Sequence, residues 1–434
     1  MRTLPRVPAK ALFCYALFAT AICFILIYGR FRYSEVSGQS GSGAVNGLRT
    51  VLAPAKSAVK KKTYVGNTGQ FVFYHLKERN YSVDPDVMSQ CVATRMTQCN
   101  PTPRRTDAER QKDRESHPPF KVAMLRNPPF MSGDPTFEGC DYDNCKFVGT
   151  GSQYAKDADA LFVYIVGMKD KDFPPPPGRR PEQTYFVGTW EAPIFTQTDF
   201  LSNENSRWNN AFNVSITYRL DSDIVYAYGK LDFQPPLPGK KPNYLQIAKN
   251  KTKTAVWIVS NCGSPSKRNE YVKEMQKYID IDIFGKCGQP CEVYDEICVP
   301  NFVSTYRFYL SFENSFCTDY ITEKFFKLYI SGSHILPVVR GGVDYNREFP
   351  KKSLVNTADF KSPKELALFL KSLAENDEEY SNYLEVKDRY RAVTYMDRFC
   401  QMCKYLHQNV GKTKVLPDAK KWYGDGHCWQ AKDI

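Results

Sequence analysis

The sequence predicts an α/β fold built on parallel sheets, because strands and helices alternate in two consecutive stretches of its second half. The later stretch begins at 306–314, which is aromatic and apolar without helical spacing, as expected of a buried strand. Helical spacing of apolar residues then runs from Thr318, a suitable N-cap, to Gly332. The apolar run 334–339 predicts the next strand.

The earlier stretch repeats this order, with a strand predicted at 254–260, a helix at 268–279 and a strand at 281–285. Tyr271 and Met275 are expected on the buried face of that helix. Helical connections between parallel strands are right-handed crossovers. The two stretches together therefore predict one Rossmann-like nucleotide-binding domain.

A second domain is expected upstream, where short strands are predicted at 121–125, 159–166 and 185–190. Glu191 follows the last of these strands, and Pro193 prevents the chain from continuing the sheet. The charged, nearly apolar-free segment 100–119 is expected to be a loop or linker. With 434 residues, the chain has room for two such cores.

The formal net charge of +12 suits a nucleic acid, an anionic membrane or a phosphate-bearing ligand. No arginine-rich helix or zinc-finger spacing accompanies this charge, which argues against nucleic acid. We therefore expect no nucleic-acid partner.

The N-terminal region contains a predicted transmembrane segment at 11–28, which has no charged residue and is about as long as a bilayer core is thick. Basic residues precede it, which favours a cytoplasmic N-terminus and a single-pass type II orientation. A cleaved signal peptide is the alternative, but no small-x-small cleavage site follows Tyr28. Residues 29–70 lack periodicity and are rich in small residues, as in a flexible stem.

The cysteine content suits an oxidising compartment. Two of the 14 cysteines lie inside the predicted anchor, and the even remainder favours disulfides. Cys140 and Cys145 would close a small loop if they were bridged to each other. Cys400 and Cys403, with His407, His427 and Cys428 nearby, leave zinc binding as an alternative.

Three Asn-x-Ser/Thr sequons predict N-glycosylation, at Asn80, Asn213 and Asn250. Asn100 is excluded because Pro101 follows it. Sequons agree with exposure to the secretory lumen.

Candidate ligand-binding residues follow the predicted strands, at the edge where parallel sheets bind ligands. Asn314, Tyr320, Glu323 and Lys324 all fall at that edge. A carboxylate beside a lysine can hold a sugar hydroxyl and a phosphate together, although the same pair is common on solvated helix faces. Glu191 is a lone carboxylate at a strand end, where such a residue is usually just solvated.

The segments 306–314 and 320–324 closely resemble the signature of the alpha-1,3-fucosyltransferases, glycosyltransferase family 10. Residues 190–193 resemble the family's aromatic-Glu-small-Pro segment, and 359–364 its Asp-Phe-x-Ser-Pro-Lys segment. Residues 218–223 are similar to its Tyr-Arg-x-Asp-Ser-Asp segment. The resemblance covers roughly residues 120–410.

This resemblance implies the GT-B fold, in which two Rossmann-like domains face a cleft. It implies an inverting transfer of L-fucose from GDP-fucose to the 3-hydroxyl of N-acetylglucosamine in a glycan acceptor. Glu191 would be the general base, and Tyr218 and Arg219 would line the cleft. The residues that would bind the donor are Arg268, Asn314, Tyr320, Glu323 and Lys324.

The resemblance also implies a Golgi membrane enzyme that requires no cofactor, with a divalent ion such as manganese at most stimulating it. The domains expected are a cytoplasmic tail at 1–10, the anchor, the stem, an acceptor-side domain at 71–248, a GDP-fucose domain at 249–400 and a disulfide-bearing tail at 401–434. The acceptor glycan stays open between the N-glycan core, lactosamine and its GalNAc-containing relative.

Two alternatives remain. Asp221 and Asp223 have the Asp-x-Asp pattern with which other glycosyltransferases hold a divalent ion on the donor diphosphate. A non-catalytic membrane-anchored sugar-binding protein is the second alternative. A decayed site would be expected to lack Glu191, Arg268 or Lys324, and all three are present.

Overall fold

The computed structural model describes residues 105–434 except 130, 132, 173–178, 197–207, 238, 291–301, 331, 394–397 and 413. The predicted anchor 11–28, the stem 29–70 and the sequon at Asn80 lie outside the described residues. Within the described part of the chain, no helix is long and apolar enough to cross a membrane.

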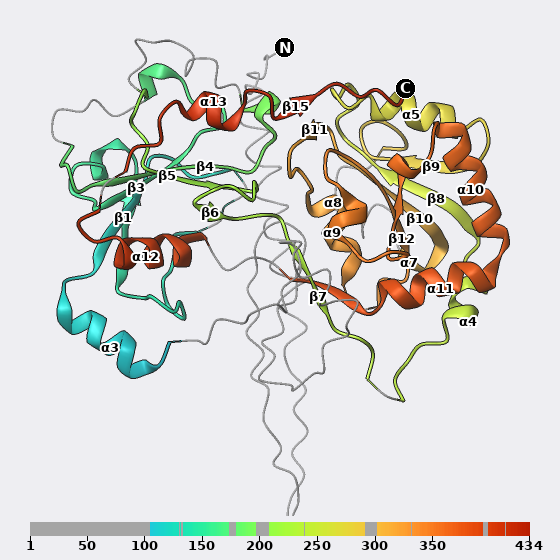
Figure 1. Cartoon of the computed structure of the whole chain (residues 1–434), viewed down its shortest axis with the longest axis horizontal. Coiled ribbons are helices and arrows are strands. Elements are labelled where there is room, and N and C mark those ends of the chain that lie inside the picture. The colour runs from blue at the N-terminus through green and yellow to red at the C-terminus, as the bar shows by residue number, and fades with distance from the viewer. Residues whose placement is uncertain are drawn as a thin grey trace, which may run out of the picture. The chain divides into compact units, whose positions relative to one another are not determined.

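Six parallel strands form the first sheet, in the order β2-β1-β3-β4-β5-β6 (Figure 1). Their bounds are β1 Phe120–Met124, β2 Cys145–Thr150, β3 Ala160–Tyr164, β4 Thr184–Thr189, β5 Val214–Thr217 and β6 Ile224–Val225. Every residue of β3 is buried, as expected when both faces of a parallel sheet are covered. The three strands predicted upstream of Glu191 are confirmed.

Five parallel strands form the second sheet, in the order β13-β12-β10-β8-β9. Their bounds are β8 Lys253–Ile258, β9 Ile281–Phe284, β10 Tyr306–Phe312, β12 Leu336–Arg340 and β13 Val355–Asn356. Both predicted strand-helix-strand stretches therefore contribute to one sheet, and the α/β prediction is confirmed.

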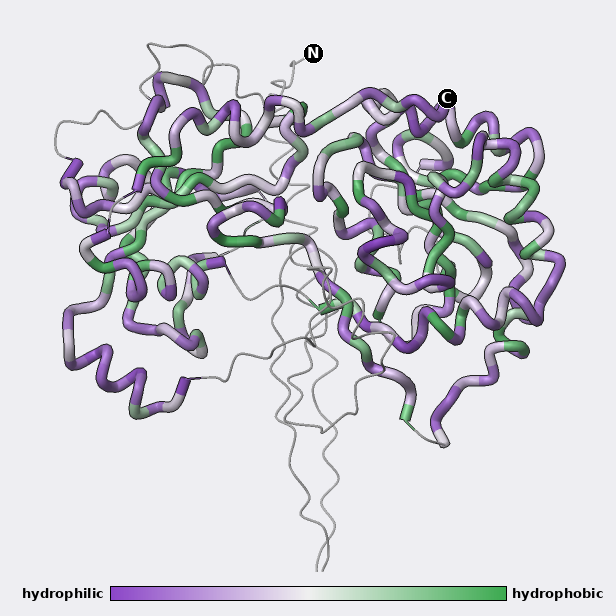
Figure 2. Tube along the Cα trace, viewed as in Figure 1, coloured by the Kyte–Doolittle hydropathy of each residue, from purple (hydrophilic) through white to green (hydrophobic). Residues whose placement is uncertain are grey.

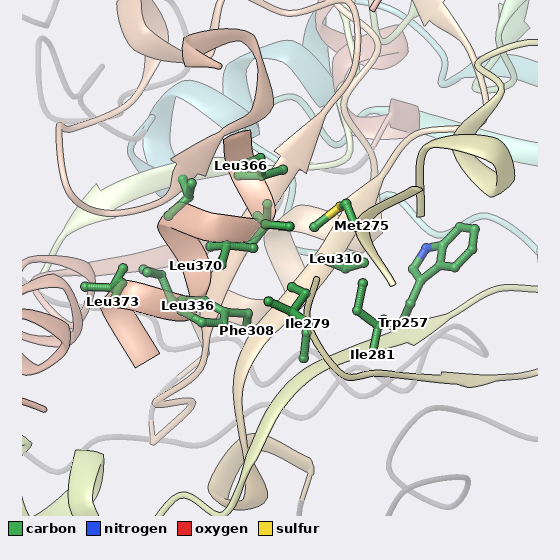
Figure 3. Close-up of a cluster of buried hydrophobic side chains, with 14 of the residues drawn as sticks. Trp257, Met275, Ile279, Ile281, Phe308, Leu310, Leu336, Leu366, Leu370 and Leu373 are labelled. Atoms are coloured by element: carbon green, nitrogen blue, oxygen red, sulfur yellow. The ribbon is translucent and has the colours of Figure 1, made fainter. Parts of the chain in front are cut away.

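Side chains of β10 alternate between two buried clusters, one on each face of the second sheet. Phe308 and Leu310 enter the cluster with helices α5 (Arg268–Met275), α10 (Pro363–Glu375) and α11 (Asp377–Lys387). Figure 3 shows Phe308 and Leu310 in the same cluster as Leu366 and Leu370 of α10. Tyr309 enters the opposite cluster. This double burial explains why the 306–314 stretch is apolar without alternation.

The helix predicted after β10 begins later than Thr318. β11 (Phe316–Cys317) pairs instead with β15 (Cys428–Trp429), and a disulfide joins Cys317 to Cys428. Asp319 then adopts a left-handed backbone with φ of 60°. Thr322 is the actual N-cap of α8 (Glu323–Phe326), which a 3-10 turn (Lys327–Tyr329) continues. The prediction of Thr318 as N-cap was wrong because that segment is held in an extended pairing.

The end of the chain returns to the first sheet, which corrects the predicted boundary at residue 400. Helix α12 (Arg398–Gln408) packs on one face of the first sheet through Phe399 and Met402. Disulfides Cys140–Cys400 and Cys145–Cys403 fasten it there. Cys140 and Cys145 are therefore not bridged to each other, and the small loop that such a bridge would close does not form.

The opposite face of the first sheet receives the segment that leads into α13 (Ala419–Tyr423), through Leu416 and Ala419. The remaining disulfide among the described residues is Cys262–Cys287. The prediction of disulfides is confirmed for the described cysteines. Cys145, Cys403 and His407 lie close together, but they do not form a zinc site because the two sulfurs are bridged to each other.

The charged segment before β1 is a helix rather than a loop. Thr106 and Glu109 form a reciprocal capping box at the start of α3 (Asp107–Ser116). Figure 2 shows α3 hydrophilic along its length, and none of its residues is buried. Its caps and ion pairs stabilise it without an apolar face.

Short elements complete the described structure. They are α4 Tyr244–Lys249, α7 Phe302–Thr305, α9 Tyr345–Glu348, the antiparallel pair β7 Lys230–Phe233 and β14 Tyr390–Val393, and 3-10 turns at Ser152–Tyr154, Asp170–Asp172, Pro193–Phe195 and Thr357–Asp359.

Candidate active site

Glu191 lies just past the carboxyl end of β4, where hydrogen bonds with the segment 226–228 and with α13 hold residues 190 and 191. The Tyr228 hydroxyl donates to the carbonyl of Trp190 at 2.8 Å, and the Trp190 indole donates to the carbonyl of Tyr226 at 3.1 Å. The Tyr423 hydroxyl, from α13, donates to the carbonyl of Glu191 itself. The chain direction at Glu191 is therefore fixed by residues far apart in the sequence.

The Glu191 carboxylate shares its surroundings with residues of α8. Burial raises its pKa; the Lys324 ammonium opposes this shift and the Glu323 carboxylate adds to it. A carboxylate with a raised pKa is a stronger base than an exposed one, and a nearby lysine keeps it ionised. Glu191 therefore interacts electrostatically with Glu323 and Lys324 of α8.

Lys324 sits in a small network at the start of α8. Its ammonium donates to the Glu323 carboxylate at 3.0 Å and to the Thr322 hydroxyl at 2.9 Å, and lies 3.6 Å from Glu313. The Lys324 side chain is 25 % exposed, whereas that of Glu313 is 0 % exposed. The ammonium is therefore anchored on its protein side and open to solvent on another.

The pKa of Glu323 is lowered. Burial acts in the opposite direction, but the Lys324 ammonium and its hydrogen bond outweigh it. Glu323 is half exposed and stays ionised, so its oxygens can accept hydrogen bonds from a bound ligand.

Arg268 opens α5 but points into the protein. Its guanidinium donates to the carbonyls of Phe312, at 2.8 Å, and Asn261, at 3.1 Å, and Nε has no partner among the described residues. Burial lowers its pKa, and Glu313 opposes that shift. Arg268 thus joins the loop after β8 to the end of β10. It interacts electrostatically with Glu323 and Lys324 of α8.

The other predicted donor residues differ in exposure. Asn314 is partly exposed, and its carbonyl accepts from the backbone N–H of Ser266 at 3.1 Å. Tyr320 is only 1 % exposed and packs edge-on against Tyr218, with ring centroids 5.0 Å apart. Asn314 is accessible to a ligand, whereas the ring of Tyr320 is buried by packing against other side chains.

Tyr218 and Arg219 do not line an open surface, which corrects the prediction for them. Tyr218 is 0 % exposed, and Arg219 is 2 % exposed. Arg219 donates to the carbonyl of Trp422, lies over the Trp422 ring at 4.9 Å and pairs with Asp221. They are buried because α13 covers them, which the order of residues in the sequence does not reveal.

Asp221 and Asp223 have separate partners in the structure. Asp221 pairs with Arg219, while Asp223 accepts from Ser215, at 2.9 Å from both its backbone N–H and its hydroxyl, and from Lys414. A carboxylate with these cationic partners has little negative charge left for a metal. The Asp-x-Asp pattern is explained by contacts within the first sheet.

Asn213 is a structural residue, so its predicted glycosylation conflicts with the fold. Its side chain is buried, accepts from the backbone N–H of Tyr185 at 2.7 Å and donates to the carbonyl of Lys414 at 2.6 Å. A glycan on this nitrogen would displace the segment before α13. Asn250, at the end of α4, is exposed and compatible with glycosylation.

Three residues at the site were assigned no role from the sequence. Thr322 has the residue type of an N-cap, which was the signal available for it. Glu313 directly follows strand β10, and its charge inside the largely aromatic and apolar 306–314 stretch was the available signal. Nothing in the sequence around Tyr423 indicates contact with Glu191.

Two family models match the chain. "Glycosyltransferase family 10 (fucosyltransferase) C-term" covers residues 248–422, and "Fucosyltransferase, N-terminal" covers residues 119–229. These ranges contain the second sheet and the first sheet, respectively.

Characterised relatives agree with the family models. The chain is 35 % identical over 301 residues to glycoprotein 3-alpha-L-fucosyltransferase A of Drosophila melanogaster, an alignment that covers 67 % of this chain and 56 % of the relative. It is 34 % identical to alpha-(1,3)-fucosyltransferase C of the same species, covering 61 % of this chain and 65 % of the relative. The chain thus spans less than two thirds of the length of either Drosophila relative. It is 32 % identical to alpha-(1,3)-fucosyltransferase 7 of Bos taurus, covering 70 % of this chain and 86 % of the relative.

A solved alpha1,3-fucosyltransferase with GDP-fucose also aligns, with 18 % identity over 68 % of this chain and 90 % of that chain, at a TM-score of 0.41. A TM-score in this range supports no structural argument. The family models and the relatives place the chain among the glycosyltransferases. Within that class it belongs to family 10, the fucosyltransferases.

Proposed function

We propose that this chain is an alpha-1,3-fucosyltransferase that moves L-fucose from GDP-fucose to the 3-hydroxyl of N-acetylglucosamine in a glycan. The observation that carries the proposal is the opposing electrostatic influence of Lys324 and Glu323, at the edge of the second sheet, on the pKa of the half-buried Glu191, at the edge of the first. A base, a cation and a hydrogen-bond acceptor are the groups that fucosyl transfer from a nucleotide requires, so this interaction supports the proposal. The names of the relatives support the same donor sugar and linkage.

Glu191 is proposed as the general base. As the acceptor oxygen attacks the anomeric carbon of fucose, its proton passes to the Glu191 carboxylate. The bond from that carbon to the diphosphate breaks at the same time, and GDP leaves with the electron pair. A single displacement of this kind inverts the anomeric carbon.

Lys324 is proposed to stabilise the charge that develops on the departing diphosphate. Its ammonium is anchored by Thr322 and Glu323, so it needs little rearrangement to meet that charge. Arg268 is proposed to add a second cation, since its Nε has no partner among the described residues. Glu323 would accept a hydroxyl of the donor, and Asn314 and Tyr320 would bound the nucleotide.

These cations support a reaction that does not require a metal, with a divalent ion such as manganese as a stimulant at most. The competing proposal, a metal-dependent transferase that uses Asp221 and Asp223, is disfavoured by the pairing of those carboxylates with Arg219 and Lys414. Activity that persists in excess EDTA would distinguish the two.

The wider setting is proposed from the sequence and the family. Two parallel-sheet domains suit a GT-B arrangement, and the uncharged segment at 11–28 suits a type II anchor in the Golgi membrane with the domains in the lumen. The acceptor is proposed to be a glycoprotein or glycolipid glycan.

The test is fucosyl transfer by the full chain in detergent, with GDP-fucose, EDTA and a panel of N-glycan-core, lactosamine and GalNAc-containing acceptors. Wild type is compared with Glu191→Gln, which keeps the shape but removes the base, and with Glu182→Gln, a matched exposed carboxylate of the first domain. We expect Glu191→Gln to lower kcat by about 10²–10⁴-fold and Glu182→Gln to leave it unchanged. GDP binding without transfer to any acceptor would overturn the proposal in favour of a sugar-binding protein.

A further inference from the structure

Glu313 is a fully buried carboxylate at the carboxyl end of β10, and the mechanism above does not use it. Its side chain is 0 % exposed. One oxygen accepts from the backbone N–H of Thr322 at 2.8 Å, and both oxygens lie 3.0 Å from the Thr322 hydroxyl. The backbone is held too, since the Glu313 N–H donates to the carbonyl of Arg340 at 2.9 Å. Glu313 therefore cannot move toward water to keep its charge.

The charged groups around Glu313 nearly cancel. The cations are Lys324 of α8, 3.6 Å away, and Arg268 of α5, whose charge Glu313 stabilises. Glu323 of α8 is a second carboxylate that acts on Glu313, and the phenols of Tyr320 and Tyr228 face it in their neutral form.

Arg340 is a further cation near Glu313 among the described residues, but its guanidinium already has protein partners. The guanidinium of Arg340, on β12, pairs with Asp433 and donates to the carbonyl of Ser266. Glu191 also acts on Lys324, so among the described residues three carboxylates face two available cations. No positive charge is in excess for a ligand with two phosphate charges.

We propose that Glu313 takes up a proton when the diphosphate of the nucleotide donor binds, so that Lys324 and Arg268 become free to neutralise the ligand. This inference rests on the proposed function, because it assumes that the diphosphate lies at these two cations. Glu313 is then the residue that sets the charge of the donor site, and donor binding depends on pH even though the ligand itself does not titrate.

The direction of the pKa of Glu313 agrees with this inference. Burial raises it, Lys324 opposes the shift and Glu323 adds to it. A bound diphosphate would act as Glu323 does and raise the pKa further. By linkage, the donor must then bind more tightly as the pH falls through the range between the free and bound values.

The experiment is isothermal titration of the full chain in detergent with GDP-fucose, without acceptor, near neutral pH, in buffers that differ in ionisation enthalpy. GDP-fucose is the right probe because both of its phosphates are esterified and do not titrate in this range. For wild type we expect proton uptake approaching about one per ligand, and an affinity that falls by up to about tenfold per pH unit.

Variants locate the proton. Glu313→Gln keeps an acceptor for the Thr322 N–H, and we expect it to bind GDP-fucose with no proton uptake and no pH dependence. Glu348→Gln removes a carboxylate that is only 2 % exposed in the same domain, and Glu191→Gln removes the proposed base; both should retain the uptake. If Glu313→Gln does not fold, infrared difference spectra of wild type should show a protonated carboxyl band that grows on GDP-fucose binding.

The outcomes separate the two proposals. If wild type does not bind GDP-fucose, the proposed function and this inference fall together. Binding without proton uptake, or without the infrared band, overturns only the role of Glu313. Uptake that survives in Glu313→Gln but is lost in Glu191→Gln assigns the proton to the base instead.

Discussion

The hydroxyl of Tyr423 donates a hydrogen bond to the backbone carbonyl of Glu191, although the two residues are 232 positions apart in the chain. Tyr423 ends α13, and the disulfide of Cys428 to Cys317 follows closely. The C-terminal segment therefore touches both the proposed base and the segment that leads to the proposed donor residues.

Tyr423→Phe should impair turnover without weakening donor binding. Loss of the hydrogen bond frees the backbone at Glu191, and small displacements of a catalytic group lower rates by up to about 10²-fold. The unfolding free energy should fall by only about 1 kcal/mol. The measurement is kcat for fucosyl transfer beside the GDP-fucose dissociation constant. Tyr383→Phe, a partly buried tyrosine of α11, is the control, and an unchanged kcat in Tyr423→Phe would exclude a positioning role.

The raised pKa of Glu191 has opposite consequences for activity and stability. Transfer needs the ionised base, so kcat at saturating GDP-fucose should rise with pH through the raised pKa. The folded state binds this proton more tightly than the unfolded state, whose pKa is near the ordinary 4.5. Below the pKa that Glu191 has in the unfolded state, this proton contributes its full stabilisation of the folded state. The stabilisation is lost as the pH rises through the pKa that Glu191 has in the folded state.

Glu191→Gln should therefore melt at a higher temperature than wild type near neutral pH, and the difference should disappear in acid. Thermal unfolding of both proteins across this pH range measures the effect. A Glu191→Gln protein that is less stable than wild type at neutral pH contradicts the assigned direction.

Removing the Cys317–Cys428 disulfide should destabilise the protein more than removing Cys262–Cys287. The sequence separations are 111 and 25 residues. The chain-entropy relation then gives losses of roughly 5 and roughly 3.5 kcal/mol for the double serine variants. Urea unfolding midpoints provide the comparison, and the reverse order would show that loop length does not govern these bridges.

The sequons at Asn213 and Asn250 should behave oppositely. Asn213→Gln should leave the glycan mass unchanged and lower the unfolding free energy by about 1–3 kcal/mol, because its buried hydrogen bonds are lost. Asn250→Gln should remove one glycan with little effect on stability. Mass spectrometry of the protein expressed through the secretory pathway measures the glycans, and urea unfolding measures the stability. A glycan found on Asn213 would require a different placement of the segment at Lys414.

Local patterns predicted strands β1, β3 and β4 of the first sheet and β8, β9, β10 and β12 of the second, but not β2, β5, β6 or β13. The run at 306–314 and the strand ending before Glu191 are buried on both faces, so their composition alone identified them. The start of α8 was placed too early because Thr318 and Thr322 are equally suitable N-caps by residue type. They are distinguished by the pairing of Phe316 and Cys317 with Trp429 and Cys428, which keeps the chain before Thr318 extended.

Long-range contacts account for the other differences. Arg219 and Asn213 have the residue types of a cleft residue and a glycosylation site, yet both are covered by the C-terminal segment. Which segment returns to cover a sheet is decided by the whole fold. No spacing rule near residue 219 or 213 could have indicated residues 414–423.

The Cys140–Cys400 and Cys145–Cys403 bridges span 260 and 258 residues, which has a consequence for biosynthesis. At about 5–20 residues per second, the partner cysteines emerge roughly 13–50 s after the first pair. During that interval Cys140 and Cys145 are neighbours with no correct partner available, and oxidation would join them to each other. The bridges of the first sheet thus form only after the strands of the second sheet have been made, although the first sheet is made first, and their formation should depend on an isomerase that reopens the premature bridge.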